Sequence, residues 1–445
     1  MDIPRSLSNL VDYANSVNTS NSERVFTMTA TAITPNDQIP LIIPTAFARY
    51  CLFGVNQSDD CRITAQLQPG VYQNEILPYR DNLHIEVVDR IGYSQVVRRY
   101  RAIPLNDSDT AMTANNTSMA DLGSKDALNL STVVFQLIDP GFAIMRNEPV
   151  SDHLLMTTLA NALDYQLKKY GEKLTLTGAD AWRGVDIEYP YDNDRIFKQI
   201  IIPSAIPLSQ LATWMQLHDQ FGFYSKGLGA YYRKGMWYIY PLLKIGRYEN
   251  ARKVANIYLL PENAFPTLKN TWFWEDKVLT ILSTGAIASN SDGTDIEKQN
   301  SGSGKRVISS DAVMGETGSY YSKGQALTTR EDSLSEYKTS ERGSGEENIP
   351  FHSTPTNNLC KLLSESALKD GTMLSRTWHN SDVLQLVPGM PCRVFFMEKD
   401  KMMYREGTIL SARGETQRDT QSIQPIFREH AALQMFISNQ TKPAE

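Results

Sequence analysis

Cysteine and histidine are scarce in this sequence, with four Cys and six His among 445 residues. No two cysteines form a C-x-x-C pair and the histidines do not cluster near them, which excludes the usual zinc motifs and a small disulfide framework. We therefore expect no metal or cofactor, and interpret all four cysteines as reduced, mostly buried thiols of a protein made in a cytoplasm. They are Cys51, Cys61, Cys360 and Cys392.

Long hydrophobic runs are also missing. The longest nearly apolar stretch, 278–288, contains Ser283, Thr284 and Gly285. It falls far short of the ~20 residues that cross a bilayer. Residues 1–6 carry charges without a following apolar run. We therefore expect neither a secretion signal nor a membrane anchor.

An excess of positive charge is absent as well. The formal net charge is −6 and the pI is about 5.7, whereas a soluble nucleic-acid binder is normally basic. The run Arg98-Arg99-Tyr100-Arg101 mixes cations with an aromatic ring, as nucleic-acid binders do. On a strand these side chains alternate between two faces, so the run predicts a strand edge blocked by charge. We expect no specific nucleic-acid binding.

Complete catalytic motifs do not occur. Neither G-x-S-x-G nor H-E-x-x-H is present. Residues 227–232 begin like a dinucleotide fingerprint but have Tyr232 at the third glycine position, and 303–306 lacks the Ser or Thr of a phosphate loop. Two S-x-x-K matches, at 335–338 and 366–369, lack the K-T-G and S-D-N motifs that accompany this pattern in penicillin-binding proteins.

Paired carboxylates that could cleave a cell-wall glycan are the remaining catalytic candidates. Asp192 with Asp194, and Glu346 with Glu347, lie in polar stretches. No apolar surrounding would raise the pKa of one partner there, as glycan hydrolysis requires. We therefore expect no catalytic, cofactor-binding or metal-binding residue, and no enzyme.

The length exceeds the roughly 250–300 residues at which a single core stops growing, so we expect several domains. In the first, 1–140, short segments alternate in polarity and are rich in β-branched residues, which indicates strands. The predicted strands cover 24–34, 62–68, 83–88, 96–103 and 132–138. Turn signals such as Pro69-Gly70 separate them, and a small antiparallel barrel over about 20–140 is the expected result. Residues 106–131 are polar and predict a long loop.

The second domain, 141–250, has helical periodicity and is expected to be α+β. A helix is predicted from Ser151 to about Tyr170, with Gly171 to end it. Its apolar stripe would consist of Leu155, Leu159, Leu163 and Leu167. A second helix is expected after Pro207, ending at Gly222.

Two features of this second domain allow more than one interpretation. His218 lies on the apolar face of the second helix beside Trp214. We prefer packing against that ring to metal binding. A tyrosine-rich hairpin follows, with its loop at 233–235. The aromatic residues of 223–240 fit either a hydrophobic core or a protein interface, where aromatics are enriched.

The last two predicted domains are 251–371 and 372–445. The first contains a polar insertion, 286–356, that has the composition of a flexible linker, and a short helix over 357–371. The second contains strands predicted over 373–379, 383–387, 392–398, 403–413 and 430–438. These strands predict a second small barrel. The expected fold class is α+β and mostly β, with two small antiparallel barrels flanking an α+β domain.

The order of these elements resembles the baseplate hub proteins of contractile-tailed phages, such as the hub subunit of the T-even phages. Three stretches carry the resemblance. They are 200–224 with the aromatic hairpin, the segment 375–389 that ends in Leu386-Val387-Pro388-Gly389, and the early barrel with Leu67-Gln68-Pro69-Gly70 and 76–83. The loop 104–131 and the insertion 286–356 are longer than in compact members of that family.

The resemblance implies a homotrimeric ring in the virion tail baseplate, assembled in the host cytoplasm. Three chains with two barrels each would adapt the sixfold tail tube to the threefold central spike. The implied partners are the tail tube protein, the central spike protein and the baseplate wedge proteins, with the genome passing through the ring lumen. The alternatives are another virion structural protein, such as a tube, wedge or connector protein, or a cell-wall-degrading tail enzyme.

Overall fold

The computed structural model assigns 54% of the described chain to strands and 19% to helices, which confirms a mostly β fold. No helix among the described residues is long and apolar enough to cross a membrane. The structure describes residues 25–41, 46–67, 69–91, 94–105, 131–190, 193–260, 271–284, 304–311, 316–321, 326–327, 346–351, 358–398, 401–418 and 426–444.

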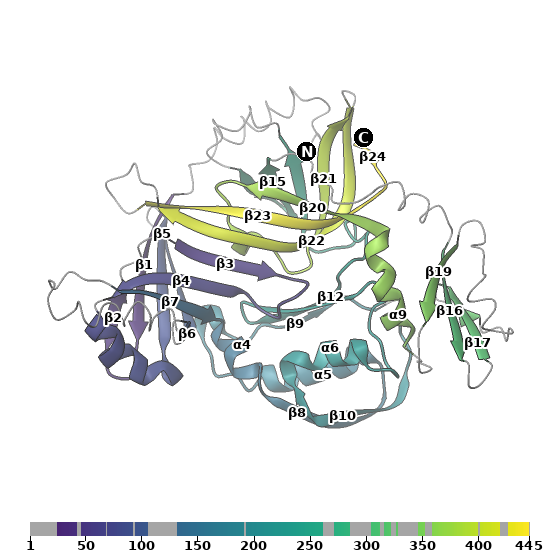
Figure 1. Cartoon of the computed structure of the whole chain (residues 1–445), viewed down its shortest axis with the longest axis horizontal. Helices are drawn as coiled ribbons and strands as arrows, with labels where there is room; N and C mark the ends of the chain where they lie inside the picture. The colour runs from purple at the N-terminus through teal and green to yellow at the C-terminus, as the bar shows by residue number, and fades with distance from the viewer. Residues whose placement is uncertain are drawn as a thin grey trace.

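An eight-stranded antiparallel barrel, which we call the N-terminal barrel, combines six N-terminal strands with two long strands from the C-terminal part (Figure 1). Going round it, the strands are β22 (Lys401–Arg418), β3 (Ala46–Leu52), β4 (Asp60–Leu67), β7 (Ser131–Ile138), β6 (Ser94–Pro104), β5 (His84–Ile91), β1 (Phe26–Ile33) and β23 (Ile426–Ser438). The barrel closes because β22 also pairs with β23. Where β23 meets β1, the rings of Phe26 and Phe427 lie 6.3 Å apart.

Alternating side chains fill the inside of this barrel, as the sequence predicts. In β4, for example, Cys61, Ile63, Ala65 and Leu67 are buried while the residues between them are more exposed. Strand β2 (Gln38–Leu41) extends the sheet beside β1. Three short helical segments connect β4 to β5, namely α2 (Pro69–Val71), η1 (Tyr72–Ile76) and η2 (Leu77–Asn82).

The two longest strands, β22 and β23, run out of the barrel into a second curved β unit. Along one edge, β22 pairs with β21 over 401–408 and with β3 over 411–417, and the change falls at a β-bulge between Ile409 and Ser411. Along its outer edge, β23 pairs with β1 and then with β20. The two units therefore share a continuous pair of strands (Figure 1).

The second unit consists of both long strands together with β20 (Gly371–Trp378), β21 (Pro391–Glu398), β13 (Val254–Leu259), β15 (Val278–Ser283) and β14 (Trp272–Glu275). Its ends meet where Thr284 and Thr377 form a single bridge with backbone hydrogen bonds of 3.1 and 3.2 Å. Strand β24 (Lys442–Pro443) pairs with β22.

A group of helices and short strands lies between the two β units in sequence, and we call it the α+β unit. Its helices are α4 (Pro140–Met145), α5 (Leu159–Gly171), η3 (Gly178–Asp180), η4 (Leu208–Gln210) and α6 (Leu211–Leu217). Its strands are β8 (Pro149–Thr157), β9 (Gly184–Ile187), β10 (Phe197–Pro207), β11 (Leu228–Arg233) and β12 (Met236–Pro241). Strands β8 and β10 form a two-stranded sheet below the helices, and β9, β11 and β12 form a three-stranded sheet above them (Figure 1).

The remaining described elements lie in the C-terminal half. They are β16 (Gly304–Asp311), β17 (Glu316–Tyr321), β18 (Ala326–Leu327), β19 (Glu346–Phe351), α9 (Leu359–Ser366), η6 (Ala367–Asp370) and η7 (Val383–Gln385). Strands β16 to β19 form a separate four-stranded sheet. The expectation that 286–356 lacks secondary structure was therefore wrong for these four stretches, because backbone pairing does not require many large aliphatics, of which the segment has few.

The helix predicted to begin at Ser151 begins later. Residues 149–157 form β8, whose backbone pairs with β10, and Thr158 caps α5 by accepting a hydrogen bond from the backbone N–H of Asn161 at 3.3 Å. Leu155 therefore leaves the predicted stripe and is 63% exposed. The other three leucines of that stripe are buried in α5.

Two other predicted elements differ from the structure. The helix after Pro207 starts as η4 and ends at Leu217, because His218 is already extended. The strand predicted over 383–387 is the 3-10 turn η7, in which the carboxylate of Asp382 accepts a hydrogen bond from the backbone N–H of Leu384 at 3.2 Å. This local capping competes with an extended backbone.

The loop of the β11–β12 hairpin is one residue shorter than the predicted 233–235, because Arg233 pairs with Met236 and only Lys234 and Gly235 remain unpaired. Lys234 and Gly235 both have positive φ, 51° and 78°, the backbone of a tight hairpin turn that matches strand twist. A Cβ at Gly235 would lie 2.0 Å from the carbonyl oxygen of Ala181. Glycine is therefore required here both by backbone conformation and by close approach.

The position of the α5 cap yields a direct test. Thr158→Ala should lower the free energy of unfolding by about 1 kcal/mol, because an N-cap hydrogen bond is lost. Ser151→Ala is the matched control and should change it by less than about 0.5 kcal/mol, since Ser151 lies on exposed strand surface. Urea denaturation of both variants measures this. The opposite ranking would show that the helix begins at Ser151.

Candidate functional site

A buried ionic cluster joins the three units. Asp59, just before β4, accepts hydrogen bonds from the Arg233 Nε at 3.0 Å and from the Tyr231 hydroxyl at 2.8 Å. Arg49 of β3 lies with its Nε 4.0 Å from the same carboxylate. Arg49 and Arg233 are 2% and 4% exposed. We call these four residues the ionic junction.

The junction reaches into the C-terminal part through backbone oxygens. Arg233 donates to the carbonyl oxygen of Leu386 at 2.6 Å and to that of Val383 at 3.1 Å. Arg49 donates to the Tyr100 hydroxyl at 3.1 Å inside the barrel. One guanidinium thus connects the barrel, the aromatic hairpin and the turn η7.

The charges of the junction depend on one another. Burial works against ionisation of Asp59, but Arg233 and Arg49 together hold its pKa below its usual range. For Arg233, burial also opposes the charge, and Asp59 is the main group that raises its pKa. Removing one member of such a group would leave an uncompensated buried charge.

The two cysteines beside the junction are unreactive thiols. Cys51 lies 3.4 Å from a terminal nitrogen of Arg233, and Cys61 lies 3.3 Å from the Nε of Arg49. Burial nevertheless raises the pKa of both thiols, so they remain protonated near neutral pH. All four cysteines are buried, which confirms that part of the prediction. We therefore assign the junction a positioning role.

The aromatic hairpin explains why so many rings occur within 223–240. Tyr232, Trp237 and Ile239 pack into the core of the α+β unit, whereas Tyr231 and Tyr240 pack into the core of the second β unit. Cys51 and Phe53 from the barrel side join that second core. The hairpin is thus buried on both faces, and of the two interpretations the core is confirmed.

The other residues singled out from the sequence have defined places. His218 packs between Trp214 and Phe221, with ring centroids 5.0 and 4.6 Å away, which confirms the packing interpretation. Arg98 pairs with Asp89, and Arg99 lies 3.5 Å from a carboxylate oxygen of Glu86. In the described structure, β7 pairs only with 101–104 of β6, so the preceding charged half is an edge.

The candidate carboxylate pairs are not brought into a site by the described structure. Asp194 is exposed, while Asp192 and the side chains of Glu346 and Glu347 lie outside the described part. Residues 335–338 and 303 also lie outside it. Within the described ranges, no group of three or more His, Cys, Asp or Glu residues could hold a metal ion.

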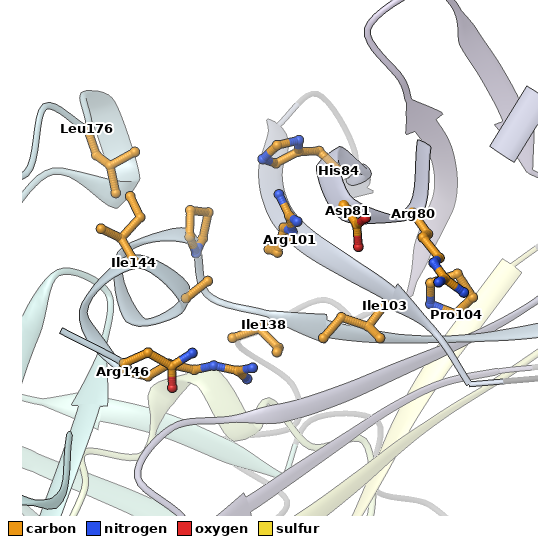
Figure 2. Close-up of a pocket in the computed structure, with 13 residues that line it drawn as sticks. Arg80, Asp81, His84, Arg101, Ile103, Pro104, Ile138, Ile144, Arg146 and Leu176 are labelled. Carbon is orange, nitrogen blue, oxygen red and sulfur yellow. The ribbon is translucent and has the colours of Figure 1, made fainter. Parts of the chain in front are cut away.

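A cavity of about 650 Å³ opens between the barrel and α4. Barrel residues Arg101, Ile103 and Ile138 line it together with Ile144 and Arg146 of the α4 region. Figure 2 shows Arg101 close to His84, with Ile103 and Ile138 below them and Arg146 beneath Ile138. No sequence motif marks this cavity, because its lining residues come from four separate segments.

Asp139 caps α4 beside this cavity and has an unusual acidity. Its carboxylate accepts hydrogen bonds from the backbone N–H groups of Gly141 at 2.9 Å and Phe142 at 3.3 Å. Burial raises the pKa of Asp139 from an ordinary 3.8 to about 7, and the negative charges of Asp180 and Asp59 act in the same direction. This carboxyl therefore titrates close to neutral pH.

Apolar side chains gather on the outer face of the β8–β10 sheet. Leu155 pairs with Gln199 and Ile201 pairs with His153, so Leu155 and Ile201 are diagonal neighbours on one face. They are 63% and 57% exposed, and Met156, next to Leu155 in the chain, is 70% exposed. Met156 also has a positive φ of 49°. Grouped exposed apolar residues are typical of protein interaction surfaces.

From the ionic junction we predict that a conservative substitution of Asp59 strongly destabilises the folded protein. Asp59→Asn should lower the free energy of unfolding by ~3–5 kcal/mol, because it leaves two buried guanidinium groups without a carboxylate. Denaturant unfolding of the full chain measures this value.

The matched control for that substitution is Asp164→Asn. Asp164 pairs with Lys168 at 2.7 Å on the exposed side of α5, where such a pair contributes only about 0.3–0.5 kcal/mol. Equal effects of the two substitutions would contradict a stabilising role for the junction.

The raised pKa of Asp139 leads us to predict that the folded state becomes less stable as the pH rises. The folded state keeps this carboxyl protonated up to about pH 7, whereas the unfolded state ionises it above its ordinary pKa of 3.8. Stability is therefore lost as the pH rises from about 4 to about 7. Asp139→Asn retains an N-cap but does not titrate. Its Tm relative to the wild type should be higher at pH 8 than at pH 5, and a pH-independent difference would refute the assignment.

Matches to this chain are found among solved structures. No protein-family model matches the chain, and no curated protein matches it significantly. The tail protein from Neisseria meningitidis MC58 is similar, with 10% identity, a TM-score of 0.44, and coverage of 92% of this chain and 96% of that chain.

Two further solved structures are similar. For the 43 kDa tail protein of prophage MuSo2 from Shewanella oneidensis, identity is 12%, the TM-score is 0.45, and coverage is 94% of this chain and 100% of that chain. The E. coli c3393 protein, a component of the type VI secretion system, is 9% identical with a TM-score of 0.36, and coverage is 92% of this chain and 77% of that chain. TM-scores below 0.5 are too low to assign a function.

Proposed function

We propose that this protein is a structural component of a phage-type tail, and more specifically a baseplate hub subunit that forms a homotrimeric ring. In this ring each chain contributes two barrels, the N-terminal barrel and the second β unit. Three chains then present six barrels, which matches a sixfold tube on one side and a threefold spike on the other. The order of elements in the sequence, which resembles the hub family, supports the same role.

The observation that carries the proposal is the pair of strands shared by the two β units. Because β22 and β23 continue from one unit into the other, the two units cannot rotate freely about a linker. A ring of alternating units requires such a fixed angle between neighbours within a chain. Separate barrels on a flexible linker would not define it.

Two surface features support assembly with other chains. The exposed apolar face of the β8–β10 sheet, with Leu155 and Ile201, is the kind of surface that partners cover. The edge half of β6 begins with the uncharged stretch 94–97, ahead of the charged run, and this stretch presents backbone groups that a neighbouring strand could pair. In a threefold ring such contacts are head-to-tail, so different patches of neighbouring subunits meet.

Mass photometry of the purified full chain tests the stoichiometry. The chain mass is 50.1 kDa, and we expect a species of three chains that becomes more abundant with concentration. A strictly monomeric chain up to the micromolar range, or a species of six chains, would overturn the hub proposal. Six chains would instead favour a tube or connector protein.

A further inference from the structure

The cavity between the barrel and α4 is positively charged although the chain as a whole has a net charge of −6. Its charged lining residues are Arg80, Arg101 and Arg146 against the single acid Asp81, which gives a formal charge of +2. Burial lowers the pKa of His84, and the positive charges of Arg101 and Arg99 lower it further. The imidazole is therefore neutral at pH 7 and does not add to this charge.

The positive charges of two of these arginines are not paired with a carboxylate within the described structure. Neither Arg101 nor Arg146 forms an ion pair with any described carboxylate. They come from different units, since Arg101 is on β6 and Arg146 follows α4. Each is partly buried, so solvent screens the charge less than at an open surface.

Between the arginines the lining is aliphatic. Ile138 is 6% exposed and, with Ile103, forms the inner wall, while Ile144 is 56% exposed at the rim near Leu176 (Figure 2). The volume of about 650 Å³ exceeds what a single inorganic anion fills. It lies within the ~300–1,000 Å³ of cavities that take organic groups.

We propose that this cavity is a docking site for an acidic peptide segment of a neighbouring protein in the assembly. A carboxylate of the segment is bound by Arg101 and Arg146, and an aliphatic side chain next to it packs on Ile103 and Ile138. Bidentate guanidinium–carboxylate contacts supply orientation and strength. The aliphatic floor supplies burial that a free phosphate ion could not use.

This site does not depend on the trimeric ring. The peptide could come from any tail protein that carries a carboxylate flanked by aliphatic residues. A failure of the peptide to bind would therefore leave the stoichiometry test unaffected. If the chain is monomeric but still binds the peptide, the proposal of a trimeric ring is wrong and the proposal of a docking site stands.

A fluorescence-anisotropy titration with the full chain tests the proposal. The probe is a fluorescein-labelled peptide of sequence Leu-Glu-Leu-Asp-Leu, and its matched control is Leu-Gln-Leu-Asn-Leu. Arg101→Gln and Arg146→Gln each remove one cation from a different element, and thermal unfolding verifies that each variant folds. Arg252→Gln is the control substitution, because Arg252 is 87% exposed and does not line the cavity.

We expect the acidic peptide to bind at least about tenfold more tightly than its amide control. Each cavity substitution should weaken that binding by about tenfold or more, and Arg252→Gln should leave it unchanged. Equal binding of the two peptides, unchanged binding by both cavity variants, or no binding up to about 1 mM peptide would each overturn the proposal. Displacement of the peptide by inorganic phosphate at an equal concentration would indicate a simple anion site and would also overturn it.

Discussion

The arrangement of the three units depends on one largely buried carboxylate, whose side chain is 15% exposed. Asp59 lies between Arg49 and Arg233, and the second of these also donates to the carbonyl oxygens of Val383 and Leu386. Charged groups are buried at a net cost unless their partners are positioned accurately. Because each buried charge of the junction needs accurately placed partners, the junction fixes how the barrel, the aromatic hairpin and the C-terminal turn meet.

Backbone pairing imposes a second constraint on the same arrangement. The barrel begins with β1 near the N-terminus but closes only when β22 and β23 pair with β3 and β1. These contacts join residues separated by more than 350 positions, as in the pairing of Phe26 with Phe427. Pairings so distant in sequence are formed late and slowly. The N-terminal barrel and the second unit should consequently fold as one cooperative body.

The sequence predicts local structure well and distant partners poorly. Alternation identified β1, β4, β5, β6 and β7, and turn chemistry placed the hairpin loop at 233–235, within one residue of the observed loop Lys234-Gly235. Residues 151–157 were misassigned to a helix because Leu155 continues a four-residue spacing that belongs to α5, and only pairing with β10 makes the segment a strand. The junction was missed because Asp59 and Arg233 are 174 residues apart. An arginine at the end of the aromatic strand 228–233 was the available signal, since a charge in a buried run requires a partner.

The central claim is that one chain contributes two barrels at a fixed angle to a threefold ring. A single-particle cryo-EM reconstruction of the assembled protein tests this claim most directly, by counting barrel-shaped densities around the axis and tracing how many chains supply them. We predict six barrels from three chains, with β22 and β23 continuous between the two barrels of each chain. Six barrels from six chains, or particles in which the two units of a chain adopt variable angles, would contradict it.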